Sequence, residues 1–233
     1  MNVHNNGRNK GSAMLKIDLY SEISCPWCII GQHRLDKVLA ERFSKLAVDI
    51  HHHPVLLLPD VPASGLHIPD LLRSRYGVAD PKQAFARPEA EARASGLDLD
   101  LSRQLWAYPT QSAHALIFAA RERGTQHQLA VAITNAYFLD AKNISDPDVL
   151  ADIAAPHGFD PGEARAIAVD PAAHMGVEQE AARSAAAGVR SVPHFIFGER
   201  LAINGGRSED EIAAAVHGTL AVKSPHPSTT LAL

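Results

Sequence analysis

Alternating hydrophobic and polar residues mark the first regular element of this chain. Leu15, Ile17 and Leu19 are separated by more polar residues, which is the period of a half-buried β-strand. The hydrophobic residues of segment 35–43 then recur at helical spacing. A second strand is predicted over residues 47–53, where alternate side chains share one face. The chain therefore begins with the order strand, helix, strand.

From residue 68 to residue 187 the hydrophobic spacing predicts an almost entirely helical block. Thr110 is expected to cap a helix that runs to Gly124, and another helix is expected over residues 126–138. Three Asp-Pro pairs place a capping carboxylate before a proline at the first helical position. They are Asp146-Pro147, Asp160-Pro161 and Asp170-Pro171. The last of these helices is expected to end at Gly188, which suits a left-handed C-cap.

Strand character returns after this helical block. Residues 189–197 and 201–203 are predicted to form a hairpin around a turn at residues 198–200. Ser208 and Glu211 have the spacing of a capping box and are expected to begin a final helix. Two half-motifs, β-α-β and β-β-α, therefore flank a helical insertion.

Composition and charge exclude several classes of partner. Hydrophobic residues make up 46% of the 233 residues and charged residues 21%, which is typical of a soluble globular protein. The net charge is −4 and the 22 Lys and Arg residues are scattered, so no nucleic-acid surface is expected. No apolar run approaches the roughly 18 residues of a membrane helix, and the N-terminus lacks the apolar core of a signal peptide. We therefore expect no membrane partner and a cytoplasmic location.

The candidate chemistry lies in two cysteines, Cys25 and Cys28, which are the only ones in the chain. A disulfide between them would close only a tiny loop, so the pair is a poor structural staple and a plausible reagent. Because Pro26 suits a first helical turn, Cys25 is expected at the helix N-terminus, where unpaired N–H groups favour a thiolate. Cys25 would then attack a disulfide, and the more buried Cys28 would resolve the product. A zinc half-site and two inert core thiols remain the competing interpretations.

Pro193 is the second feature that this pattern singles out. A proline at this place can be a simple strand boundary. Its position at the start of the predicted hairpin favours instead a cis Val192–Pro193 bond that turns the backbone toward the helix N-terminus.

Two segments of the chain resemble the DsbA-like thioredoxin superfamily, and most closely its cytoplasmic FrnE-like branch. They are Ser24–Cys28, with Gly31 and Leu35 after it, and Gly188–Phe195. The resemblance covers about residues 14–220. It implies an α/β, thioredoxin-like fold with a large all-helical insertion. Residues 14–60 and 188–222 would form the discontinuous thioredoxin-like domain and residues 61–187 the inserted domain. Residues 1–13 and 223–233 would be flexible tails.

The same resemblance implies a nucleophilic Cys25, a resolving Cys28 and a cis Pro193 that faces them. Val192 would pair through its backbone with an incoming peptide, and Pro26 and an exposed Trp27 would also contact substrate. No cofactor is implied beyond the redox-active disulfide, with glutathione as a candidate co-substrate.

The chain departs from that branch at three places. Residues 51–54 read His-His-His-Pro where an aromatic residue and an arginine are usual. Pro109 replaces an asparagine that is common before the next helix, and residues 204–206 read Asn-Gly-Gly in place of the more frequent Ser-Gly-Ala. These departures weaken inferences about substrate and leave the dithiol chemistry intact.

Three further residues are accessory candidates. Glu22 is either a proton relay to Cys28 or a solvated carboxylate. His52 is either a core histidine or a residue beneath the cysteine motif that affects its titration, and His114 either packs in a helix or faces the cleft. His51 and His53 share a strand face, so at most two histidines of this run could chelate together, and no metal site is expected.

Three functions follow. The first is a thiol–disulfide oxidoreductase that acts on protein or small-molecule thiols and disulfides. The second is a glutathione-dependent isomerase or transferase of the 2-hydroxychromene-2-carboxylate isomerase or kappa type, against which Cys28 counts because that branch lacks it. The third is a non-redox peptide-binding or chaperone module. The direction of electron flow stays open, as does the choice between monomer and homodimer.

Overall fold

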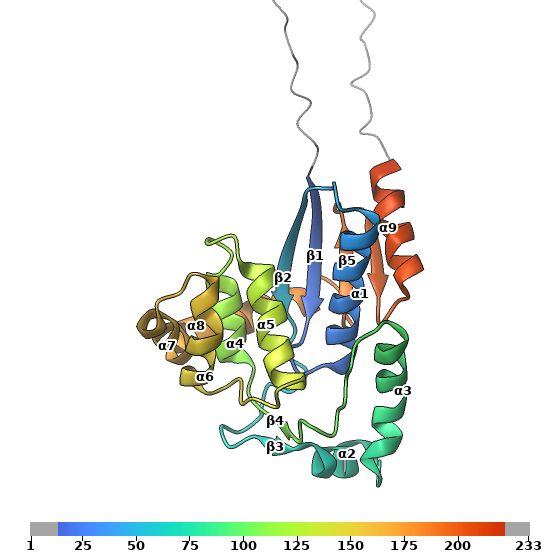
Figure 1. Ribbon diagram of the computed structural model, residues 1–233. Coiled ribbons are helices and arrows are strands. Elements are labelled where there is room, and N and C mark those ends of the chain that lie inside the picture. The colour runs from blue at the N-terminus through green and yellow to red at the C-terminus, as the bar shows by residue number, and fades with distance from the viewer. Residues whose placement is uncertain (1–13, 222–233) are drawn as a thin grey trace, which may run out of the picture.

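A four-stranded sheet forms one part of the protein, shown as a ribbon in Figure 1. The computed structural model describes residues 14–221, so the predicted tails lie outside the described residues. The sheet has the order β2-β1-β5-β6, with β1 and β2 parallel and the other neighbours antiparallel. Its strands are β1 (Leu15–Ser21), β2 (Val48–Pro54), β5 (His194–Phe197) and β6 (Leu201–Asn204).

Two helices cover one face of this sheet, α1 (Pro26–Arg42) and α9 (Glu209–Ala221). The alternating apolar side chains of β1 point to this face and pack against Leu35 and Val38 of α1 and Val216 of α9. Ser208 and Glu211 form the predicted capping box at the start of α9, since each accepts a hydrogen bond from the other's backbone N–H. Together these elements make up the predicted α/β, thioredoxin-like arrangement.

The segment between the two halves is mainly helical, as expected. Its helices are α2 (Ile68–Tyr76), α3 (Pro81–Ala94), α4 (Gln111–Ala119), α5 (Gln126–Phe138), α6 (Pro147–Ala154), the short 3-10 helix η1 (Ala155–His157), α7 (Pro161–Val169) and α8 (Pro171–Ala186). The carboxylates of Asp146, Asp160 and Asp170 accept backbone hydrogen bonds at three of the helix N-termini, which confirms the predicted caps. Among the described residues, no helix is long and apolar enough to cross a membrane.

Several predicted boundaries are wrong. Two short strands pair with each other, β3 (Leu66–His67) just before the block that was expected to be helical and β4 (Trp106–Ala107) within it. They were not predicted, because two residues are too few to show an alternating pattern. The helix that follows Thr110 ends at Ala119, and a turn then leads to Gly124. Strand β5 begins only at His194, directly after the cis Val192–Pro193 bond.

Two hydrophobic clusters fill the interior, and α1 contributes to both. One cluster lies under the four-stranded sheet and includes Leu35 and Val38. The other lies among the inserted helices and includes Ile29 and Ile30. This distribution supports the division into a discontinuous domain and an insertion, which stays a prediction.

The backbone of α1 comes very close to the segment that leads into β5. A Cβ atom placed on Gly31 would lie 2.7 Å from Cγ of Pro193 and 3.2 Å from Cζ of Phe195. Both distances are shorter than side-chain contacts normally allow. Glycine at position 31 therefore permits the contact that joins the N-terminal half-motif to the C-terminal one.

We predict that Gly31→Ala destabilises the protein relative to Gly176→Ala. Both glycines are helical and gain the same helix propensity on substitution, but Gly176 in α8 has nothing within 4 Å of its Cβ position. Overpacking against Pro193 should lower the free energy of unfolding of Gly31→Ala by about 1–3 kcal/mol relative to the control. Urea unfolding of the two variants measures this difference. Equal stabilisation by both substitutions would show that the contact is looser than described.

Candidate active site

Cys25 occupies the N-cap of α1. Strand β1 ends at Ser21, and a turn follows in which the backbone N–H of Cys25 donates to the carbonyl of Glu22. Cys25 has extended backbone angles and Pro26 is the first helical residue, as the sequence predicts. Cys28 lies one turn further on and donates its backbone N–H to the carbonyl of Cys25 at 2.9 Å. The motif is therefore placed on a helix N-terminus by the proline that follows the first cysteine.

The two thiols are free and differ in their tendency to ionise. Cys25 is 8% exposed and Cys28 is 4% exposed. A hydrogen bond from the Cys28 thiol, aided by the backbone N–H groups of Cys28 and Trp27, lowers the pKa of Cys25 even though burial opposes this. Burial first, and then the interaction with Cys25, raises the pKa of Cys28 well above its usual value. The thiolate is thus favoured on Cys25, as attack on a disulfide requires.

Pro193 lies against the α1 backbone near Gly31 and follows a cis peptide bond, as predicted. Its carbonyl accepts a hydrogen bond from the N–H of Gly205 at 2.7 Å, which ties it to the end of β6. Pro193 is buried and Val192 is partly exposed. The structure therefore brings Pro193 to the helix that carries both cysteines.

An apolar cavity of about 230 Å³ opens beside Cys25. The lining from the motif is Ser24, Cys25 and Pro26. The other lining residues come from the loop after β2, from α2, α3 and α5, and from the segment around β4: Leu57, Leu58, Ile68, Leu71, Leu72, Tyr76, Ala84, Phe85, Leu101, Gln104, Ala107, Tyr137 and Phe138. Most of them are aliphatic or aromatic, so this cavity suits an apolar group next to the reactive sulfur.

Trp27 is only partly exposed, so its expected exposure is wrong. The guanidinium of Arg87 in α3 lies 5.3 Å from the centre of its ring. Gly206 also lies against this ring, because a Cβ atom placed on Gly206 would be 2.6 Å from Cε3 of Trp27. The Asn-Gly-Gly segment thus allows the loop after β6 to cover the indole, which does not line the cavity. A substrate-binding role for Trp27 stays a prediction, as it does for Val192.

Glu22 is 1% exposed, so the interpretation as a solvated carboxylate is wrong. Its Oε2 accepts hydrogen bonds from the backbone N–H of Leu57 at 3.1 Å and from the hydroxyl of Thr110 at 3.4 Å. This second bond explains why Thr110, at the N-cap of α4, makes no side-chain capping bond. The negative charge of Glu22 opposes the lowering of the Cys25 pKa, and it adds to the raised pKa of Cys28, whose main causes are burial and Cys25.

His114 of α4 faces Glu22 and does not line the cavity. Its Nε2 lies 3.6 Å from Oε1 of Glu22, and both side chains are almost fully buried. Within residues 14–221, this Nε2 atom has no hydrogen-bond partner. Of the two expected alternatives, packing within the helical part is therefore confirmed, and the buried carboxylate of Glu22 lies beside the packed imidazole.

His52 is buried, and its hydrogen-bond partners lie outside the cysteine motif. Its Nε2 lies 2.8 Å from Nδ1 of His127 in α5, whose Nε2 lies 2.7 Å from Oδ1 of Asp36 in α1. Burial, followed by the electrostatic interactions with His127 and His114, holds the pKa of His52 well below its usual value. An influence of His52 on the titration of the thiols stays a prediction.

Sequence reasoning missed the residues that hold Glu22 and those that line the cavity. Glu22 lies close to Cys25 in the sequence and could be named, but Leu57 and Thr110 reach it through tertiary contacts. The apolar residues of α2 and α3 show no local sign of facing the motif. Their helices were predicted without any indication of which face meets Cys25.

Comparison with known proteins places the chain among thioredoxin-like proteins. The model of the DSBA-like thioredoxin domain family matches residues 16–217. The crystal structure of the probable DsbA oxidoreductase SCO1869 from Streptomyces coelicolor is similar with a TM-score of 0.80 and 26% identity, covering 92% of this chain and 94% of that one.

Two further solved structures share the fold at lower identity. A 2-hydroxychromene-2-carboxylate isomerase has a TM-score of 0.62 and 13% identity over 88% of this chain and 95% of its own. The cytosolic disulfide reductase DsbM from Pseudomonas aeruginosa, in a structure with GSH, has a TM-score of 0.61 and 16% identity over 89% of this chain and all of its own.

We predict that Glu22→Gln lowers the pKa of Cys25. The amide keeps a hydrogen-bond acceptor but removes the negative charge that disfavours the thiolate. The pH dependence of alkylation of Cys25 by iodoacetamide measures the shift. Glu41→Gln, at an exposed position near the other end of α1, is the matched control and should leave the profile unchanged. A profile that moves to higher pH in Glu22→Gln, or moves equally in both variants, would contradict the assignment.

Proposed function

Because the chain belongs to the DSBA-like thioredoxin domain family, we propose that it is a thiol–disulfide oxidoreductase that works through Cys25 and Cys28. The observation that carries this proposal is the placement of two free thiols on α1, Cys25 at its N-cap and Cys28 one turn inward, on the helix that Pro193 contacts. Cys25 is the thiol that would attack the substrate, and Cys28 is the thiol that would stay protonated until the second exchange step.

The reaction that this arrangement supports has two exchange steps. The Cys25 thiolate attacks one sulfur of a substrate disulfide, forms a mixed disulfide and releases the other substrate sulfur as a thiolate. Cys28 then loses its proton and attacks the sulfur of Cys25. A Cys25–Cys28 disulfide forms, and the second substrate sulfur leaves. Two electrons pass from the dithiol to the substrate, and the reverse sequence oxidises a substrate dithiol.

Glu22 is assigned as the acceptor of the Cys28 proton in the second step. Its carboxylate is buried behind the motif, and its charge acts on both thiols. A carboxylate held by Leu57 and Thr110 can accept a proton without a change of position. The proton would arrive when Cys28 becomes the nucleophile, which is the moment when a thiolate must form in the buried site.

The substrate that the cavity favours carries an apolar group beside its disulfide. The lining from α2, α3 and α5 is almost entirely aliphatic or aromatic. A peptide could extend past Pro26 and pair with the backbone of Val192, next to the cis Pro193. The substrate-binding roles of Pro26, Trp27, Val192 and Pro193 belong to this proposal.

We further propose that the protein acts in the cytoplasm, where the reducing environment favours reduction or isomerisation of disulfides. The fold shared with the cytosolic disulfide reductase DsbM supports this setting. Glutathione is the candidate co-substrate that would return the Cys25–Cys28 disulfide to the dithiol. No other cofactor enters the proposed reaction.

A glutathione-dependent isomerase is the second candidate, since a 2-hydroxychromene-2-carboxylate isomerase shares the fold. The raised pKa of Cys28 and its interaction with Cys25 have no use in such a reaction, and this argues for the dithiol enzyme. A module that only binds peptides would use the apolar cavity and neither thiol.

We predict that the wild type reduces insulin disulfides and that Cys25→Ser abolishes the reaction. Cys28→Ser should lose turnover by about 100-fold or more and accumulate a mixed disulfide with the substrate, because the resolving thiol is absent. Turbidity of the insulin B chain measures turnover, and mass spectrometry of the non-reduced protein detects the adduct.

His67→Ala, a partly exposed position on β3, serves as the control and should keep full activity. An inactive wild type that instead turns over glutathione conjugates would establish the isomerase alternative. Equal suppression of peptide aggregation by the wild type and both cysteine variants, without any reduction, would establish the binding module.

We predict that Leu71→Asp in α2 selectively impairs apolar substrates. A charge in the cavity lining should lower kcat/KM for a disulfide peptide with a leucine beside its cysteine by about 10- to 100-fold, mainly through KM. The alkylation profile of Cys25 should stay unchanged. Leu220→Asp, at an exposed position on α9, is the matched control. Equal losses for apolar and polar peptides would show that the cavity does not select substrate.

A further inference from the structure

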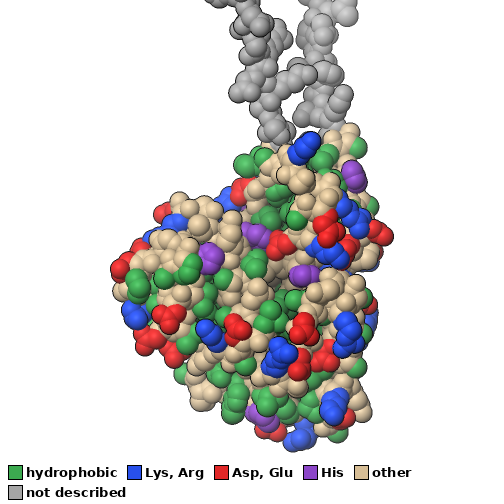
Figure 2. Space-filling view, viewed as in Figure 1, with side chains coloured by type: hydrophobic (Ala, Val, Ile, Leu, Met, Phe, Trp, Pro, Cys, Tyr) green, Lys and Arg blue, Asp and Glu red, His purple; other side chains and the backbone are tan. Residues whose placement is uncertain are grey.

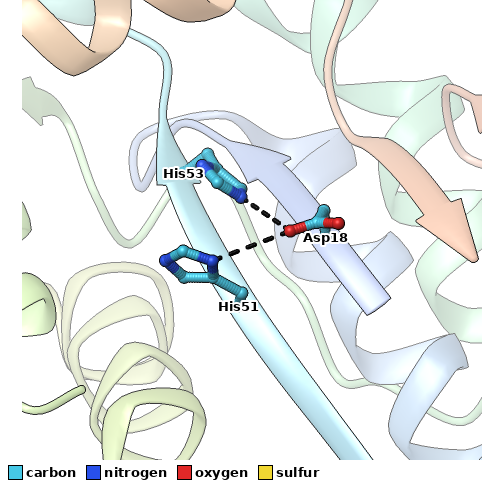
Figure 3. A group of neighbouring side chains, drawn as sticks. All are labelled: Asp18, His51 and His53. Carbon is cyan, nitrogen blue, oxygen red and sulfur yellow. Dashed lines mark hydrogen bonds and ion pairs between the residues drawn. The ribbon is translucent and has the colours of Figure 1, made fainter. Parts of the chain in front are cut away.

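A second cluster of reactive side chains lies on the main sheet, away from the two cysteines. Strands β1 and β2 are parallel neighbours, and their register places Asp18 opposite His51 and Tyr20 opposite His53. Alternate residues of a strand point to the same face, so Asp18, His51 and His53 all point away from the face that α1 and α9 cover. Figure 3 shows the two imidazoles of β2 directed toward the carboxylate of β1.

The distances within this cluster match those of an incomplete metal site. Nε2 of His53 lies 2.9 Å from Oδ1 of Asp18, and Nδ1 of His51 lies 3.7 Å from the same oxygen. One ligand atom from each residue falls within 4.8 Å of the other two. Zinc bonds of about 2.0–2.2 Å place tetrahedral ligand atoms roughly 3.3 Å apart, so small side-chain rotations would bring all three around one ion.

Neighbouring residues hold His53 in the orientation that a metal ligand needs. Nδ1 of His53 lies 3.2 Å from Oε1 of Glu180 in α8, on the side opposite Asp18. The ring of Tyr20 stacks on His53, with centroids 4.4 Å apart and planes inclined by 15°. A carboxylate that accepts from one ring nitrogen directs the other toward the metal, which is the usual outer partner of a ligating histidine.

Burial and charge also fit a divalent cation. The side chain of Asp18 is 10% exposed and that of His51 is 33% exposed, so one side of the cluster is open to solvent. Asp18 and Glu180 supply two negative charges beside two imidazoles, and Arg183 pairs with Oε2 of Glu180 at 2.6 Å, the oxygen that His53 does not contact. Lys16 lies 3.4 Å from Oδ2 of Asp18, the oxygen that the histidines do not use, and is itself 42% exposed.

We propose that Asp18, His51 and His53 bind a first-row divalent transition-metal ion, with Zn²⁺ as the preferred occupant and water completing its coordination. This proposal departs from the expectation that the chain holds no metal site. Two histidines of the run share a face, as the sequence predicts, and the third ligand comes from the neighbouring strand. The His-His-His-Pro segment, in which the chain differs from the FrnE-like branch, supplies the two imidazoles.

The competing arrangement contains no metal. In that arrangement His53 is an imidazolium that donates to Asp18 through Nε2 and to Glu180 through Nδ1. The two arrangements differ in whether a proton or a metal ion occupies the space between His53 and Asp18, so a binding experiment separates them.

The experiment uses the full chain with Cys25→Ser and Cys28→Ser, because the dithiol itself binds thiophilic metals. Co²⁺ is titrated and its visible ligand-field absorption recorded, and Zn²⁺ is then added to displace it. We expect one equivalent of Co²⁺ to bind and Zn²⁺ to replace it. In this background His51→Ala, His53→Ala and Asp18→Asn should each weaken binding at least tenfold, and Glu180→Gln should weaken it about 10- to 100-fold.

His67→Ala is the matched control. His67 also pairs with a carboxylate, that of Asp70, but it does not belong to the group of Asp18, His51 and His53. This variant should bind Co²⁺ like its parent, the full chain with Cys25→Ser and Cys28→Ser. His51 is partly exposed, so His51→Ala keeps the test valid if another variant fails to fold. Saturating Zn²⁺ should also raise the Tm of the parent by several degrees and leave that of His51→Ala unchanged.

The proposal is overturned if the parent binds no Co²⁺, or if His51→Ala and His53→Ala bind it as tightly as the parent. Nitrogen NMR that finds both ring nitrogens of His53 protonated, with no change on addition of Zn²⁺, would establish the imidazolium arrangement. None of these outcomes depends on the thiol chemistry, because both cysteines are absent from the protein tested.

Discussion

The close contact between the α1 backbone and Pro193 is the constraint on which the rest of the structure depends. It joins segments from opposite ends of the chain, and it exists because position 31 has no side chain. Helix α1 then contributes Ile29 and Ile30 to the core of the inserted helices and Leu35 and Val38 to the core under the sheet. The helix that presents the thiols is therefore held from three sides, and its N-terminus has a defined position relative to the cavity.

Two groups of ionisable side chains, each with buried members, lie near this helix. Glu22, Thr110 and His114 meet behind the cysteine motif, while His52, His127 and Asp36 form a separate chain between β2, α5 and α1. Charged groups in such places require partners, because burial without them would be strongly unfavourable. The two thiols thus lie in an environment to which residues of the inserted helices contribute. On the face shown in Figure 2, basic and acidic side chains are interspersed over both parts of the molecule.

The sequence was informative where local chemistry decides the structure. Pro26 after Cys25, the Asp-Pro pairs and the Ser208 capping box each predicted an observed helix start, and the position of Pro193 predicted the cis bond. The sequence was uninformative where contacts between distant segments determine the position of a side chain. Trp27 was expected to be exposed, but Arg87 and Gly206 cover it, and these residues lie far away in the sequence. The pairing of Asp18 with His51 depends on the register of two parallel strands, which no single segment encodes.

The burial of Glu22 also bears on the reduction potential of the dithiol. A dithiol is a strong oxidant when the protein stabilises its reduced form, chiefly through the thiolate. A carboxylate enclosed next to the pair acts in the opposite sense, because its field disfavours the thiolate and has no comparable effect on the uncharged disulfide. Relative to a site with the same helix N-terminus and no such carboxylate, this dithiol should therefore release its electrons more readily. A single buried negative charge thus acts on the dithiol in the sense opposite to the helix N-terminus.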